Sequence, residues 1–248
     1  MDGVLLPILI CILMVLVNCG SMPGIGMGSM NCNGLRSKEK LEKVLTWLKN
    51  KEDSIFFIQE SHCTSDFENT WEAIWDGPIY FSHGTSNATG VAILIKKNAG
   101  IQVIRHKEVV QGRGHILEIE YDSVNLCLVN VYSPNNDDVD FLKNIFHEAL
   151  GCNRNDYTIY GGDWNAILDD NIDKSGGSLK HSAQKSQIFL NSMISDYGLC
   201  DILRLSKGNQ RIYTHVNKKS HSLSRLDYFL IDDNLVNLPI CSSLVMAI

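Results

Sequence analysis

The sequence lacks the cysteine spacing that holds zinc. Eight Cys occur among 248 residues, but no two of them form the C-x-x-C pair that accompanies paired His in a zinc finger. Without such spacing, neither a structural zinc site nor a disulfide framework is indicated. We expect buried free thiols instead, because Cys is among the most frequently buried residue types.

An excess of positive charge is also missing. The chain has 22 Lys plus Arg against 28 Asp plus Glu, which gives a formal net charge of −6. Because this charge repels phosphate, a generally basic nucleic-acid-binding surface is excluded, and a polyanion would need a local basic face or a bound cation. With 44% hydrophobic and 20% charged residues, the composition is that of a globular protein with one large or two small domains.

The sequence has no apolar run that would cross a bilayer comfortably. Residues 4–17 are uncharged, but their length is that of the apolar region of a signal peptide, and small residues follow at positions 19–21. No Lys or Arg precedes Arg36, so the basic start of a signal peptide is missing. Three interpretations stay open: a secretory signal or membrane anchor, a non-native chain start, and a buried core segment.

These patterns divide the chain into three parts. We expect residues 1–21 to be a signal-like or anchor-like segment that would permit membrane contact. Residues 22–29 are rich in Gly and Met, which indicates a linker or a poor first strand because Gly is depleted in strands. Residues 30–248 carry the mixed hydrophobic periodicity of a folded domain.

Hydrophobic periodicity predicts three helices. Leu41, Val44, Leu45 and Leu48 recur at helical spacing, with Lys and Glu on the other face. They predict a helix over residues 37–51. Similar apolar stripes predict helices over residues 137–150 and 182–197.

Short apolar runs between these helices predict strands. Residues 54–58 form one such run, apolar on both faces and followed by polar residues. The other predicted strands span residues 90–95, 101–110, 115–131 with a turn at 122–123, 157–160, 211–216 and 226–231. We expect the α/β class, with two mainly antiparallel sheets packed face to face as a sandwich and flanking helices outside.

Polar clusters stand at the ends of the predicted strands. Each one alone is compatible with a turn. Together they offer carboxylates, amides and a phenol, which suit magnesium and a phosphate better than a soft metal. The clusters are Asn31-Cys32-Asn33-Gly34, Gln59-Glu60-Ser61-His62, Asn130 to Asn135, Gly162-Asp163-Trp164-Asn165, and Ser224 to Tyr228.

These clusters, in this order, resemble the endonuclease/exonuclease/phosphatase superfamily. More narrowly, they are similar to the apurinic-type endonuclease domain of LINE-class non-LTR retrotransposons. The resemblance spans about residues 30–245 and rests on seven motifs in sequence. The motifs are N-C-N-G-L, Q-E-S-H, G-V-A-I-L, N-V-Y-S-P-N, G-G-D-W-N, Y-T and S-R-L-D.

The resemblance implies a role for each matched residue. Glu60 would be the principal ligand of Mg²⁺, or of Mn²⁺ in its place, with Asn33 in the outer shell of the metal. Asp163 would orient and deprotonate the attacking water. Asn31 and Asn165 would donate hydrogen bonds to the scissile phosphate. No small organic cofactor is implied.

Further positions would complete the site. Tyr132 would stabilise the leaving or a non-bridging oxygen, Asn135 and Thr214 would line the same pocket, and Asp227 would orient a catalytic histidine. We expect a structural role for His62 and a core position for Trp164. A local basic face for the DNA phosphodiester backbone would come from Lys218, Lys219 and Arg225, together with Arg105, Lys107 and Arg113.

One motif of the family is not matched. The Ser-Asp-His motif, which supplies the catalytic imidazole, normally lies about two dozen residues beyond the position of Asp227. Here 248 minus 227 leaves 21 residues, and residues 235–248 contain neither His nor Asp. We therefore expect a C-terminally truncated domain over residues 30–248, without its closing strand and with one sheet edge unpaired.

The leading functional hypothesis is magnesium-dependent hydrolysis of phosphodiesters by a DNA endonuclease of retrotransposon origin, inactivated if the missing imidazole is essential. Two alternatives stay open. One is a phosphomonoesterase or phospholipase with the same fold, and the other is a non-catalytic remnant or membrane-tethered fragment. The resemblance implies a nuclear location, whereas residues 4–17 point to the secretory route.

Overall fold

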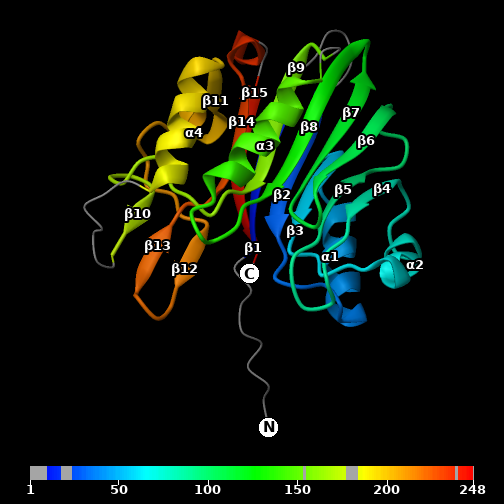
Figure 1. The fold of residues 1–248 in the computed structure, drawn as a ribbon. Helices are drawn as coiled ribbons and strands as arrows, with labels where there is room; N and C mark the ends of the chain where they lie inside the picture. Colours follow the sequence, from blue (N-terminus) through cyan, green and yellow to red (C-terminus); the bar gives the residue numbers. More distant parts are fainter. Residues whose placement is uncertain (1–9, 18–23, 153–154, 177–183, 238–239, 248) are drawn as a thin grey trace.

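The fold is a sandwich of two six-stranded sheets with helices on its outer faces (Figure 1). The structure is a computed structural model that describes residues 10–17, 24–152, 155–176, 184–237 and 240–247. A smaller three-stranded sheet lies beside the sandwich. The predicted α/β sandwich with flanking helices is confirmed.

The first sheet has the strand order β15-β1-β2-β3-β5-β4. β2 and β3 are parallel, and the other neighbours in this sheet are antiparallel. In that order, the strands are β15 (Ile240–Ala247), β1 (Ile10–Val17), β2 (Ile25–Asn31), β3 (Ile55–Gln59), β5 (Val91–Ile95) and β4 (Ile79–Ser82).

The second sheet has the order β11-β14-β9-β8-β7-β6, and only β8 and β9 are parallel among its described strands. Its strands are β11 (Leu199–Asp201), β14 (Asp227–Asp232), β9 (Tyr157–Asp163), β8 (Val124–Tyr132), β7 (Gly114–Tyr121) and β6 (Gln102–Val110). The small sheet consists of β10 (Lys174–Ser175), β13 (Ser222–Ser224) and β12 (His215–Asn217).

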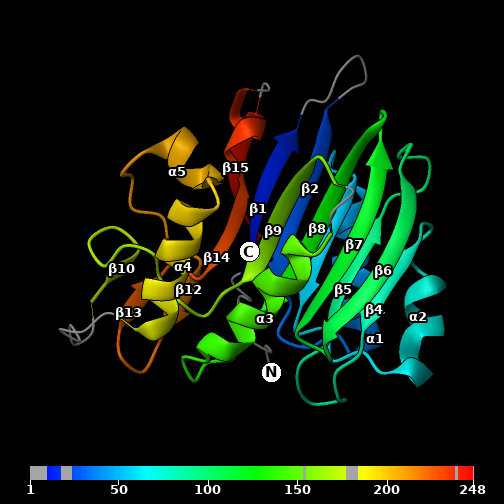
Figure 2. The same cartoon turned by 45° about the horizontal axis from the view of Figure 1, so that its top comes forward.

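Helices cover the outer faces of the two sheets (Figure 2). α1 (Lys38–Lys49) begins at the cap Ser37 and buries its predicted leucine stripe against the first sheet. α3 (Val139–Leu150) and α4 (Lys185–Asp196) cover the second sheet. The shorter elements are α2 (Glu68–Glu72), α5 (Ile202–Lys207) and the 3₁₀ turns Ser65–Phe67 and Asp233–Asn237.

Apolar side chains from both sheets meet in the central core. Met27 and Phe57 from the first sheet pack in one cluster with Leu128 and Phe229 from the second. The rings of Phe57 and Phe229 meet edge to face with centroids 5.3 Å apart. The hydrophobic effect therefore holds the two sheets face to face.

The apolar N-terminal segment contributes a strand to the first sheet. Ile10–Val17 forms β1, which pairs with β2 on one side and with β15 on the other. β2 thus has a partner on both sides. The signal-like role of residues 1–21 stays a prediction, since residues 1–9 and 18–21 lie outside the described part of the chain. Among the helices that the structure describes, none is long and apolar enough to span a bilayer.

Two expectations about the elements were incomplete. The predicted strand 211–216 is regular only as β12, a short strand of the small sheet, and its start is irregular loop. The helices α2 and α5 were not predicted, because stretches of 5 and 6 residues are too short to display a full helical stripe.

Candidate active site

The predicted site residues meet where strands of both sheets end. In the parallel pair β2–β3, Asn31 is aligned with Gln59, so Glu60 follows directly beside it. In the parallel pair β8–β9, Tyr132 is aligned with Asp163. Parallel strands that end together place their last side chains at one edge, and the sandwich brings the two edges face to face.

Asn31 joins the two sheets through its side-chain amide. Its Nδ2 donates one hydrogen bond to Glu60 Oε1 at 2.8 Å and one to Asp163 Oδ2 at 2.8 Å. Its Oδ1 accepts from the backbone N–H of Asn33 at 3.0 Å. Because both amide protons are used by carboxylates, Asn31 holds these two carboxylates in place. Its expected role as a donor to the phosphate stays a prediction.

Residues with unusual backbone angles lie around the hydrogen bonds that Asn31 makes to Glu60 and Asp163. Asn33, Glu60 and Asn165 have φ values of 45°, 49° and 48°, in the left-handed region that non-glycine residues rarely adopt. Such residues cost of order 1 kcal/mol each and cluster at functional sites. Gly162 has φ +141°, and a Cβ there would lie 2.0 Å from the carbonyl oxygen of Val131. Glycine therefore lets β9 approach β8 closely and sets Asp163 beside Tyr132.

Asp163 and Asp227 form a buried carboxylate pair. They are register partners on β9 and β14, and each is 7% exposed. Burial raises the pKa of Asp163 to about 6, against the hydrogen bond from Asn31, which lowers it. Burial and the negative charge of Asp163 raise the pKa of Asp227 well above its ordinary value.

Thr214 Oγ1 accepts hydrogen bonds from the backbone N–H groups of Leu226 and Asp227, at 2.9 and 3.2 Å, and so fixes the start of β14.

The donor set fits a hard divalent cation. Glu60 and Asp163 bring carboxylate oxygens to the same amide; Asp163 is buried, so its negative charge is poorly solvated, whereas Glu60 is partly exposed. Within the described residues, no group of three or more His, Cys, Asp or Glu could enclose a metal. Magnesium keeps several waters and takes few carboxylates, so Glu60 would hold it. Asn33 is exposed beside Asn31 and suits an outer-shell role.

Two polar groups face the same region from the second sheet. Asn165 donates from Nδ2 to the carbonyl of Ser133 at 2.7 Å and from its backbone N–H to Asp163 Oδ1 at 3.0 Å. One N–H of its amide is left for a substrate. Burial and the charge of Glu60 raise the pKa of Tyr132 above its ordinary value, so the phenol stays protonated at neutral pH. Asn135 is exposed in the loop after β8.

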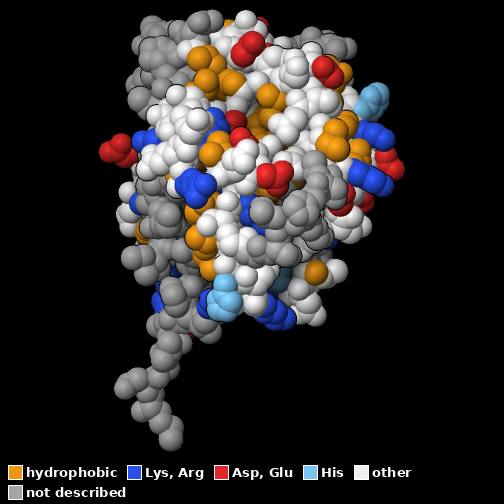
Figure 3. Space-filling view, turned by 90° about the vertical axis from the view of Figure 1, so that its left-hand side faces the viewer, with side chains coloured by type: hydrophobic (Ala, Val, Ile, Leu, Met, Phe, Trp, Pro, Cys, Tyr) orange, Lys and Arg blue, Asp and Glu red, His pale blue; other side chains and the backbone are white. Residues whose placement is uncertain are grey.

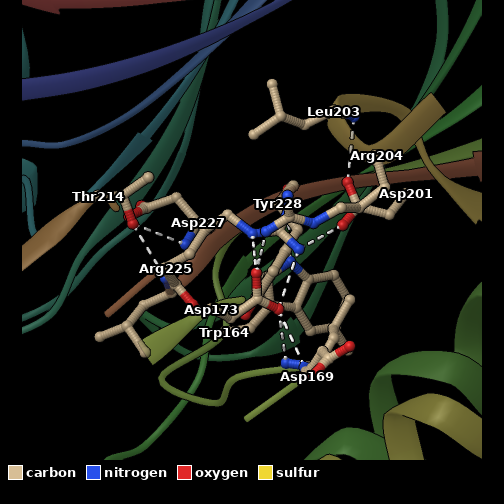
Figure 4. Close-up of polar contacts among 12 residues, drawn as sticks. Trp164, Asp169, Asp173, Asp201, Leu203, Arg204, Thr214, Arg225, Asp227 and Tyr228 are labelled. Atoms are coloured by element: carbon tan, nitrogen blue, oxygen red, sulfur yellow. Dashed lines mark hydrogen bonds and ion pairs between the residues drawn. The ribbon is translucent and has the colours of Figure 1, made fainter. Parts of the chain in front are cut away.

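Arg225 does not reach the surface, which corrects its expected role in binding substrate. Its side chain is 0% exposed, and Nε and Nη2 contact Asp173 Oδ1 and Oδ2 at 2.7 and 3.1 Å (Figure 4). Nη2 also lies 2.6 Å from Asp201 Oδ2, and Arg204 pairs with the same Asp173. Through this ion pair with Asp173, Arg225 fixes the segment before Asp227 to the loop after β9.

The expected basic face is also dispersed. Arg105 pairs with Glu118, and Lys107 pairs with Glu148. On the face drawn in Figure 3, the Lys and Arg side chains are scattered among acidic and neutral ones. Lys218 and Lys219 remain exposed in the turn between β12 and β13.

The histidines of the described structure differ in their surroundings. His115 on β7 is fully buried, and its Nε2 lies 3.3 Å from Asn130 Nδ2. His62 Nε2 lies 3.9 Å from Glu60 Oε2, and its ring would touch a Cβ at position 34, so this side chain packs behind the loop of Asn33. His215 and His221 are exposed on the hairpin of the small sheet. Trp164 is buried, as expected.

Sequence comparison agrees with this geometry. Residues 28–243 match the profile of the Endonuclease/Exonuclease/phosphatase family. The chain belongs to this family. Its members are hydrolytic nucleases and phosphatases, and they generally use divalent metal ions.

The chain is also similar to a transposon protein. The chain is 27% identical over 220 residues to the Transposon TX1 uncharacterized 149 kDa protein of Xenopus laevis, and the match covers 86% of this chain but 16% of that protein. The chain therefore spans about a sixth of the length of this relative.

Two solved structures share the fold. An AP endonuclease from Leishmania major superposes with a TM-score of 0.69 at 15% identity, covering 90% of this chain and 87% of its own. The endonuclease domain of TRAS1, a telomere-specific non-LTR retrotransposon, gives a TM-score of 0.59 at 16% identity, with coverage of 85% and 86%.

Proposed function

We propose that the chain is a magnesium-dependent endonuclease that hydrolyses phosphodiester bonds of the DNA backbone. The observation that supports this most is the bridge from Asn31 to Glu60 and Asp163. It gathers a carboxylate for a metal and a carboxylate for a base in one place. When bound at Glu60, the metal would neutralise charge on a phosphate oxygen.

Asp163 is suited to accept the proton of the attacking water. A base works best when its pKa lies near the working pH, and burial raises the pKa of Asp163 to about 6. The negative charge of Glu60 adds to its proton affinity. The remaining amide N–H of Asn165 can bind a phosphate oxygen without adding negative charge.

Tyr132 takes the position of a proton donor. Its phenol is held beside Glu60 and stays protonated, because both burial and that charge raise its pKa. Donation from the phenol would stabilise the leaving oxygen. This would give the site a hydrogen-bond donor that does not depend on an imidazole.

The DNA substrate and the retrotransposon origin are part of the same proposal. Similarity to a Xenopus transposon protein supports the origin, and the fact that both structural relatives are endonucleases supports a nucleic-acid phosphodiester. Lys218 and Lys219, exposed on the hairpin of the small sheet, could contact the backbone of the duplex.

The proposal predicts cleavage of diesters and not of monoesters. The experiment compares an end-labelled DNA duplex with p-nitrophenyl phosphate, each with magnesium and with EDTA. We expect internal cuts in the duplex that require magnesium, and no release of nitrophenol above background. Hydrolysis of the monoester beside an intact duplex would instead assign the site to a phosphomonoesterase.

A further inference from the structure

A second polar layer lies beneath the candidate active site, between the two sheets. Gln59 on β3 and Asn130 on β8 are both fully buried, in a core that is otherwise largely apolar. Both belong to the strand-end motifs, but the proposed chemistry gives neither of them a role. Burying two carboxamides is costly unless their hydrogen bonds are satisfied.

The hydrogen bonds of this layer run from one sheet to the other. Asn130 Nδ2 donates to the carbonyls of Ile58 and Ala92 in the first sheet, at 3.1 and 2.9 Å. Its Oδ1 accepts from Gln59 Nε2 at 2.8 Å. Gln59 Nε2 also donates to Ser29 Oγ at 3.2 Å. A side chain of the second sheet is thus fixed directly to β3 and β5 of the first sheet, and through Gln59 to β2.

This layer lies directly below the site residues. Ser29 is two residues before Asn31 on β2, and Asn130 is two residues before Tyr132 on β8. Residues two apart on a strand point to the same face. Gln59 is the residue immediately before Glu60. Each strand therefore carries one member of the polar layer next to one residue of the site.

The geometry of the site depends on the spacing between the sheets. Asn31 reaches Glu60 in its own sheet and Asp163 in the opposite sheet, and both distances are 2.8 Å. Such hydrogen bonds are lost when donor and acceptor move apart by several tenths of an ångström. Apolar contacts are not directional and tolerate a small sliding of one sheet on the other, whereas a satisfied polar network specifies one arrangement.

We propose that Gln59 and Asn130 are positioning residues, which lock the two sheets at the spacing where Asn31 joins Glu60 to Asp163. This inference deepens the proposed endonuclease function and rests on it for its effect on rate. The geometric part, the placement of the Asn31 amide, is independent of any reaction.

The test replaces both carboxamides, as Gln59→Leu/Asn130→Leu, so that neither amide is left buried without the other, although Ser29 and His115 each lose one contact. We expect a folded protein whose kcat for duplex cleavage falls by about 10 to 100-fold, because misplacement by an ångström can cost that much. KM should change by less than about twofold, since the DNA-facing surface is unaltered. The matched control, Leu128→Ala, alters the same core two residues before Asn130 and should lower stability without lowering the kcat of the folded protein.

A second measurement uses the side-chain amide signal of Asn31 in NMR spectra without metal. In the wild type, two carboxylates accept its N–H groups, and we expect its shifts to move toward those of exposed Asn in the double variant and to stay unchanged in Leu128→Ala. If wild-type protein cleaves no DNA, the proposed function fails while this signal still decides the inference. An unchanged Asn31 signal together with an unchanged kcat in the double variant overturns the positioning inference.

If the double variant does not fold, Gln59→Met keeps the Asn130 donors satisfied and should show the same changes to a smaller extent.

Discussion

Replacing Asp163 by Asn is expected to lower the rate of DNA cleavage by about 10² to 10⁴-fold, the usual contribution of a general base. Asn keeps the size of the side chain but cannot take a proton from water. Burial has already raised the pKa of Asp163 to about 6, which suits it to this role. Single-turnover rates on an end-labelled duplex, at saturating protein and magnesium, measure the change.

The matched control is Asp196→Asn. Asp196 is exposed at the end of α4, far along the chain from the strand ends that form the site. This variant should cleave at the wild-type rate. A rate in Asp163→Asn within about threefold of wild type would show that this carboxylate does not act as the base.

Replacing Asp227 by Asn is expected to stabilise the fold in the absence of metal. Asp227 is buried beside Asp163, and burial together with that charge raises its pKa well above the ordinary value. Between the ordinary and the raised pKa, the folded state binds more protons than the unfolded state. Stability of the metal-free wild type therefore falls as the pH rises through this interval.

This gain follows from the charge that is removed. At pH 8 in EDTA, Asp227→Asn should raise the free energy of unfolding, because the variant cannot carry a buried negative charge beside Asp163. Urea unfolding at pH 5 and pH 8 measures it, and the gain should be larger at pH 8. Asp196→Asn serves as the control here too. Equal stability of Asp227→Asn and wild type at pH 8 would contradict the account of a repelling pair.

Local patterns predicted much of the fold. The helix 38–49 followed from four apolar residues at helical spacing, and β3 followed from an apolar run that is buried on both faces. Both patterns report burial directly, because one side of a helix or both sides of a central strand must leave water. The hairpin of β7 and β8 was predicted from polar turn residues at Asp122 and Ser123, which interrupt a long apolar stretch.

These local patterns did not predict which residues pair across long distances in the sequence. Arg225 looks like a surface residue of a basic motif, yet its partner Asp173 lies 52 residues away in the sequence, so no local signal predicts the burial of this ion pair. The short helix α5 and the strand β11 owe their shape to packing against β14 rather than to periodicity.

The candidate site was predicted in part. The strand-end motifs placed Asn31, Glu60 and Asp163 correctly at the ends of their strands, and the register then brings them together. The motifs did not show which groups would accept the hydrogen bonds of the Asn31 amide. Both amide protons of Asn31 are taken by carboxylates, and this depends on the distance between the two sheets.

The most direct test of a metal-dependent nuclease site at Glu60 is the nicking of supercoiled plasmid as magnesium is titrated. The full chain is compared with Glu60→Gln and with Glu72→Gln, an exposed glutamate of α2. We predict nicked circles that accumulate with magnesium, vanish with EDTA, persist in Glu72→Gln and are lost in Glu60→Gln. Equal nicking by the wild type and Glu60→Gln, or no nicking by the folded wild type at any magnesium concentration, would contradict the account.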